Sequence, residues 1–146
     1  MDATSGELLV REARAYAAFE DAVAAVPAER REVPMLPDGW SVKDVLWHVA
    51  YWWRDGEQSF RAMRAGTYVH EHSSDAQTDA TNARVLAESR SMSAAAVEAG
   101  LAAARVGVLE AFASVAGDPA ADELFASETI EHYEEHLAAV RELGTP

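Results

Sequence analysis

Apolar residues recur at steps of three and four along most of the chain, which is the spacing of an amphipathic α-helix. Segments rich in proline, glycine and serine separate these stretches. No stretch alternates apolar and polar residues as a half-buried strand does. The pattern predicts an all-α protein, an up-down four-helix bundle in a single domain over residues 1–146. Its helical segments are expected from Thr4 to Pro27, from Ser41 to Gly66, over Asp75–Gly117 with a break at Ser91–Ser93, and from Pro119 to Leu143 before Gly144.

The starts of the first two helices carry capping signals. Thr4–Glu7 has the spacing of a capping box, in which the first and fourth residues satisfy each other's backbone N–H groups. In the second helix Ser41 is the expected N-cap and Asp44 the third helical residue, while Trp40 is placed to pack on Val45. These signals fix where the second helix begins.

Aromatic residues surround the second helix on more than one side. Trp47 and Tyr51 fall opposite its core stripe, so we expect them to lie in a subunit interface, that of a homodimer, or beneath the loop Pro27–Gly39. Gly100 and Gly107 lie on one side of a later helix and indicate either a close neighbouring helix or simply tolerated glycines. The core stripe of the second helix is expected to be Val42, Val45, Leu46, Val49, Trp53 and Phe60.

Charge and composition exclude several classes of function. The net charge of −13 disfavours nucleic acid and anionic membranes as partners, because both require clustered basic residues. The chain has no cysteine, which excludes disulfides, cysteine zinc sites, iron–sulfur clusters and a thiol nucleophile of its own. With no basic, apolar leader and no apolar run long enough to span a bilayer, a cytoplasmic location is expected.

Three histidines are candidate metal ligands. His132 and His136 are one helical turn apart, so both imidazoles lie on one face of the last helix. His48 flanks the apolar stripe of the second helix, and the three together would form a set that leaves coordination positions open. Taken singly, each could equally be a surface or hydrogen-bonded core imidazole. Glu128 and Glu131 are either acceptors that orient a histidine or solvated charges.

A further pair, His70 and His72, belongs to the loop Gly66–Ser74. Neighbouring residues alternate faces if that loop is extended, and we expect both imidazoles to be solvated. The substrate pocket is expected to be lined from this loop and from the loop Pro27–Gly39.

Two motifs together resemble the DinB-like superfamily of four-helix-bundle metalloproteins. They are Gly39–His48 (GWSVKDVLWH) and Glu131–Leu137 (EHYEEHL), and the match extends in order and spacing over the whole chain. In that family the histidine after the Trp-Ser helix start and two histidines of the last helix bind a divalent metal, commonly zinc or nickel. The resemblance implies that His48, His132 and His136 hold this ion.

The same family contains thiol S-transferases that use mycothiol or bacillithiol, mycothiol-dependent maleylpyruvate isomerases, self-protection proteins and many members of unknown activity. The chain carries His132 where the isomerases tend to have glutamate, and it lacks their additional C-terminal domain, so we do not expect isomerisation. A metal held by three neutral imidazoles keeps its double positive charge and favours a bound thiolate. We therefore expect conjugation of a low-molecular-weight thiol to a small electrophile. Hydrolysis by metal-activated water and non-catalytic sequestration of a ligand remain alternatives.

Overall fold

The structure is a computed structural model that describes residues 3–145. Throughout these residues the regular structure is helical, and no β-strand occurs. None of the described helices is both long enough and apolar enough to cross a membrane. The helices are α1 (Ala3–Ala25), the 3₁₀ turn η1 (Ala28–Arg30), α2 (Val42–Ala65), α3 (Asp75–Arg90), α4 (Ala94–Ala113), α5 (Pro119–Ala126), the π-helical turn η2 (Ser127–Glu131) and α6 (His132–Gly144).

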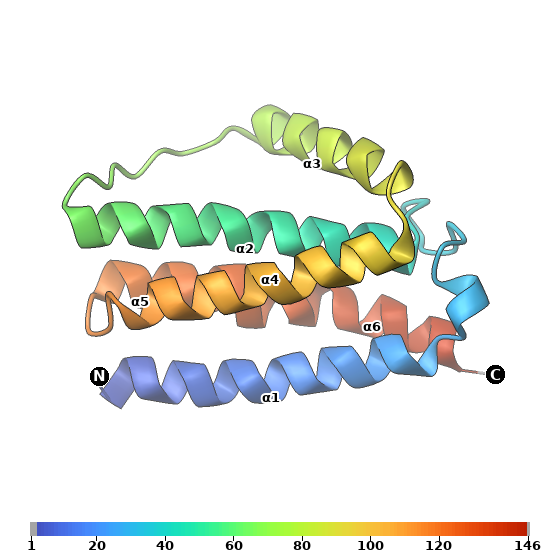
Figure 1. Cartoon of the computed structure of the whole chain (residues 1–146), viewed down its shortest axis with the longest axis horizontal. Coiled ribbons are helices and arrows are strands. Elements are labelled where there is room, and N and C mark those ends of the chain that lie inside the picture. The colour runs from blue at the N-terminus through green and yellow to red at the C-terminus, as the bar shows by residue number, and fades with distance from the viewer. Residues whose placement is uncertain (1–2, 146) are drawn as a thin grey trace.

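Four helical rods surround the core, and their directions differ from the predicted up-down order. Figure 1 shows α1, α2, α4 and the continuous α5–α6 rod side by side, with α3 on the outer side of α2. The segment expected to form one interrupted helix folds back on itself at residues 91–93, so that α3 and α4 run in opposite directions. As a result α2 and α4 run in the same direction, opposite to α1 and α6. The sequence located the break but not the reversal, because a short polar turn does not show where the next helix packs.

The predicted start of α2 is confirmed in detail. Ser41 Oγ accepts a hydrogen bond from the backbone N–H of Asp44, and Asp44 Oδ2 accepts one from the backbone N–H of Ser41. Asp44 Oδ1 also accepts a hydrogen bond of 2.7 Å from Ser89 Oγ near the end of α3. The cap therefore joins two helices as well as starting one.

The first helix begins differently from the prediction. Its described part starts at Ala3, so Thr4 lies inside the helix rather than at its N-cap. Ser5 Oγ donates a 2.6 Å hydrogen bond to Asp122 Oδ1 and accepts one from the Gly117 N–H. This polar contact ties the beginning of α1 to the turn before α5.

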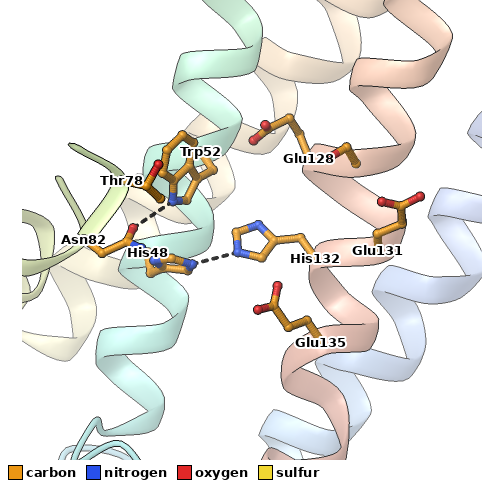
Figure 2. A pocket seen from close by; sticks show the side chains of 9 residues that line it. His48, Trp52, Thr78, Asn82, Glu128, Glu131, His132 and Glu135 are labelled. Atoms are coloured by element: carbon orange, nitrogen blue, oxygen red, sulfur yellow. Dashed lines mark hydrogen bonds between the residues drawn. The ribbon is translucent and has the colours of Figure 1, made fainter. Parts of the chain in front are cut away.

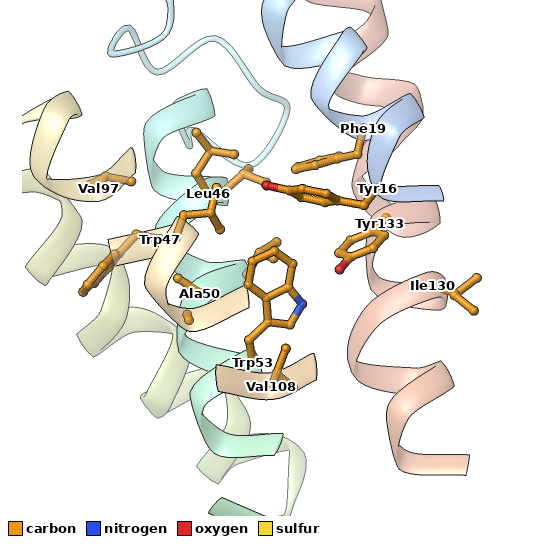
Figure 3. Packing of buried hydrophobic residues seen from close by; sticks show 14 of the residues in the cluster. Tyr16, Phe19, Leu46, Trp47, Ala50, Trp53, Val97, Val108, Ile130 and Tyr133 are labelled. Carbon is orange, nitrogen blue, oxygen red and sulfur yellow. The ribbon is translucent and has the colours of Figure 1, made fainter. Parts of the chain in front are cut away.

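The centre of the core is aromatic (Figure 3). The Tyr133 ring of α6 lies 5.5 Å from Tyr16 and 5.8 Å from both Phe19 and Trp53, measured between ring centroids. All six residues of the predicted α2 stripe are buried, which confirms that face. These ring contacts hold α2, which carries His48, against α6, which carries His132 and His136.

An ion pair with a buried carboxylate lies against this core, and no sequence pattern predicted it. Glu12 is only 1% exposed and pairs with Arg105 at 2.8 Å, while the Tyr133 hydroxyl donates to Glu12 Oε1 at 2.9 Å. Burial, together with the carboxylate of Glu12, raises the pKa of the Tyr133 hydroxyl, so it remains a donor. The network fixes the position of the α6 residue that follows His132.

Trp47 is buried and Tyr51 partly buried within the same chain, where they pack against α3 and α4. Trp47 Nε1 donates to a carboxylate oxygen of Glu88 at 3.2 Å, and the guanidinium of Arg84 lies 5.4 Å from the Tyr51 ring centroid. A Cβ atom on Gly100 would lie 2.6 Å from the Trp47 ring, which confirms the predicted close approach at this glycine. The apolar patch on which the dimer prediction depended is therefore an intramolecular interface, formed by helices and not by the loop Pro27–Gly39.

Candidate metal centre

The three predicted histidines come together between α2 and α6. His48 Nε2 and His132 Nε2 are 2.7 Å apart (Figure 2), and the three possible ligand nitrogens of His48, His132 and His136 all lie within 4.8 Å of one another. His48 is 7% exposed and His132 8%. These three residues, close together and largely shielded from solvent, could hold a metal ion.

A π-helical turn just before His132 sets the orientation of this face. Phe125 is buried before the turn, Thr129 and Ile130 are both buried within it, and Tyr133 is buried after it, so the buried positions shift by one residue inside the turn. A π turn inserts one residue into the helix and so rotates everything that follows. Thr129 Oγ1 donates to the Phe125 carbonyl at 2.6 Å within this region. The sequence analysis treated the last helix as regular, although two apolar stripes out of phase are the signal of such an insertion.

The imidazoles are held in their neutral form. Burial, reinforced by the neighbouring His132 and His136, lowers the pKa of His48 to about 3. Burial and His136 lower the pKa of His132 to about 4, opposed by a hydrogen bond with the backbone of Glu128. Burial also lowers the pKa of His136. Neutral imidazole is the form that donates a lone pair to a metal, so the site is prepared for ligation near pH 7.

The donor set fits a divalent ion. Within residues 3–145, His48 Nδ1 and His136 Nε2 are buried atoms with no hydrogen-bond partner, and buried polar atoms of that kind are uncommon. Two imidazole nitrogens on one tetrahedral zinc would lie about 3.3 Å apart, between the 2.7 Å contact and the 4.8 Å limit of the cluster. The hydrogen bond of His132 with the Glu128 backbone is the outer-shell support that ligating histidines usually have.

A pocket of about 320 Å³ lies beside His48 and His132. Its far wall comes from α3, where Asn82 Oδ1 accepts a 3.1 Å hydrogen bond from Trp52 Nε1 (Figure 2). The prediction that the loops Pro27–Gly39 and Gly66–Ser74 line this pocket is wrong. It failed because the sequence did not show that α3 covers α2. The pocket is lined by His48, Trp52, Thr78, Asn82, Ser127, Glu128, Glu131, His132 and Glu135.

The loop before α2 instead approaches the cluster from another side. The Trp40 ring packs against His48 with 5.1 Å between ring centroids, and the charge of Asp38 raises the pKa of His136 against the effect of burial. The predicted packing partner of Trp40 was Val45. The structure shows its ring against the imidazole of the first candidate ligand.

Glu128 is the most strongly perturbed acid at the pocket. Burial, followed by the nearby carboxylate of Asp55, raises the pKa of Glu128 to about 8, and burial also raises the pKa of Asp55. Glu128 thus carries a proton at neutral pH and can donate it. Glu128 and Glu131 were predicted either to orient a histidine or to be solvated charges. The backbone of Glu128 makes the contact with His132, and its side chain lines the pocket. Glu131 lines the same pocket with an exposed side chain.

His70 and His72 lie outside this cluster. Both are exposed, as predicted, yet their imidazoles meet each other, with 3.2 Å between the Nε2 atoms. The Tyr68 hydroxyl is 3.3 Å from His70 Nδ1.

Comparison of the chain with protein-family models, curated proteins and solved structures found no match. The case for the site therefore depends on its own geometry and on the two sequence motifs.

Proposed function

We propose that the protein is a metal-dependent enzyme of the DinB-like four-helix-bundle type, one domain over residues 1–146, that conjugates a low-molecular-weight thiol to a small electrophile. In this proposal His48, His132 and His136 hold one divalent ion, Zn²⁺ or Ni²⁺, and mycothiol or bacillithiol is the thiol. The observation that carries it is the meeting of three neutral imidazoles, two buried and one half-buried, of which His48 and His132 line a pocket. The two motifs resembling the family support the same assignment.

The chemistry follows from charge. A divalent ion on three neutral ligands would lower the pKa of an incoming thiol and favour its thiolate. Thr78 and Asn82, together with the carboxylates of Glu131 and Glu135, line the pocket and offer hydrogen-bond partners to the hydroxyl groups of a sugar-linked thiol. Glu128, protonated near neutral pH, is placed to give its proton to a leaving group or a developing anion.

Hydrolysis is the second candidate, favoured by the acidic lining of the same pocket. Glu131 and Glu135 could accept a proton from a water molecule that attacks a substrate. The two reactions share the metal ligands and differ in the nucleophile found in the product.

The test is to incubate metal-loaded protein with a panel of electrophiles, with and without mycothiol or bacillithiol, and to identify products by mass spectrometry. We expect a thiol adduct that forms with wild type, is lost in His136→Ala and is retained in Glu134→Gln, a change at an exposed position of the same helix. Turnover that needs no thiol would overturn the transferase proposal in favour of hydrolysis. Absence of any turnover would favour a binding protein that sequesters its ligand.

A homodimer and a cytoplasmic location remain predictions. Because α3 covers Trp47 and Tyr51, these rings no longer require a second subunit. Light scattering at micromolar concentration measures the oligomeric state directly.

A further inference from the structure

The segment between α2 and α3 brings two imidazoles to one point on the surface. His70 and His72 are two residues apart in extended chain, where side chains two apart share a face. Their Nε2 atoms are 3.2 Å apart, and the rings are nearly perpendicular, at 88°. Two nitrogens that bind one metal ion tetrahedrally at about 2.0 Å are separated by about 3.3 Å. The spacing of the pair therefore already matches that of a chelating pair.

A tyrosine supports this arrangement. The Tyr68 hydroxyl lies 3.3 Å from His70 Nδ1 and can accept its proton in a hydrogen bond. That bond would leave the lone pair on Nε2, the atom that faces His72. Ligating histidines usually have their second ring nitrogen held in this way.

The pair borders a hollow that also contains a carboxylate. The hollow measures about 570 Å³, and α5 contributes Glu123 to its lining. A carboxylate supplies an oxygen ligand and negative charge, and the net charge of −13 favours cations over the whole molecule.

We propose that His70 and His72 bind a second divalent transition-metal ion through their Nε2 atoms, with water completing its coordination and the carboxylate of Glu123 adding negative charge to the hollow beside it. Paired imidazoles suit Cu²⁺, Ni²⁺ and Zn²⁺, and Cu²⁺ binds most tightly in this series. The site is exposed and has two histidines instead of three, so its affinity is lower than that of the cluster His48, His132 and His136.

The two sites are neighbours. Ser127, at the start of the π-helical turn, lines both the hollow beside His70 and His72 and the pocket beside His48 and His132. An ion held at the surface pair is therefore close to the pocket of the buried cluster, although its binding depends on different residues.

The experiment titrates chelator-treated full-length protein with Cu²⁺ by equilibrium dialysis and records electron paramagnetic resonance spectra. We expect two ions per chain in wild type and one in the double variant His70→Ala/His72→Ala. Glu71→Ala, which changes the residue between the two histidines, is the matched control and should still bind two. Circular dichroism checks that each variant is folded.

The reciprocal variant separates this proposal from the proposed function. In His132→Ala/His136→Ala we expect one Cu²⁺ to remain, with nitrogen hyperfine splitting that disappears when His70 and His72 are also replaced. An unchanged number of ions and an unchanged spectrum in His70→Ala/His72→Ala would overturn the surface site. Wild type that binds a single ion, lost only in that double variant, would support the surface site and contradict the buried one.

Discussion

Acid should destabilise the metal-free protein through the same burial that prepares its histidines for ligation. An unfolded histidine has a pKa of about 6.5, whereas that of folded His48 is lowered to about 3 and that of folded His132 to about 4. Between these values the unfolded chain binds protons that the folded chain excludes. The free energy of unfolding therefore falls as the pH drops below 6.5, and it is unaffected by these two groups above that pH.

The size of the effect at pH 4.5 depends mainly on the unfolded state. That pH lies two units below 6.5, so each of the two groups costs about 2.7 kcal/mol relative to pH 7.5. This loss is a large part of the stability of an ordinary domain. The substitution His48→Gln removes one titrating group and keeps a polar side chain. Between pH 7.5 and pH 4.5 the free energy of unfolding of this variant should therefore fall by about 2.7 kcal/mol less than that of wild type.

The assay is urea unfolding in the presence of chelator, followed by tryptophan fluorescence at a series of pH values between 7.5 and 4.5. The quantity compared is the difference between the two pH profiles, in which contributions from other groups cancel. Parallel profiles for wild type and His48→Gln would refute the reasoning, because they would mean that folding leaves the proton affinity of His48 unchanged.

Three further predictions concern side chains around the site. Burial raises the pKa of Glu128 from its ordinary 4.5 to about 8, so its contribution lowers the free energy of unfolding as the pH rises from 4.5 towards 8. In urea unfolding, Glu128→Gln should therefore be more stable than wild type at pH 8, by about 4 kcal/mol, with little gain at pH 4.5. Gly100→Ala should lower the unfolding midpoint because its Cβ would meet the buried Trp47 ring, whereas Gly107→Ala, which would meet only the end of a flexible side chain, should be neutral or stabilising. Tyr133→Phe should cost about 1.5–3 kcal/mol in the same assay by removing a hydrogen bond to a buried carboxylate.

Local signals predicted much of the secondary structure. Ser41 and Asp44 placed the start of α2, and the break at residues 91–93 was located correctly, because capping and helix interruption depend on a few neighbouring residues. The direction of α4 relative to α2 was not predictable in this way. It depends on α3 packing over Trp47, a contact between residues far apart in the chain.

The candidate site was likewise predictable only where it depends on local sequence. The spacing of His132 and His136 predicted a shared face, and His48 joined them through the resemblance of two motifs. The pocket wall contributed by Asn82 and the protonated state of Glu128 depend on tertiary packing, so sequence could not supply them. The π-helical turn could have been predicted from the sequence, because the apolar positions before and after it are out of phase.

Metal content measures the central claim most directly. The protein is purified without an affinity tag in the His70→Ala/His72→Ala background, so that only the buried cluster contributes, and its bound metals are quantified by mass spectrometry. The account predicts one divalent ion per chain, lost on replacing His48, His132 or His136 by alanine and kept in Glu134→Gln. Metal content that is the same in all three alanine variants as in their parent would contradict the site and the mechanism built on it.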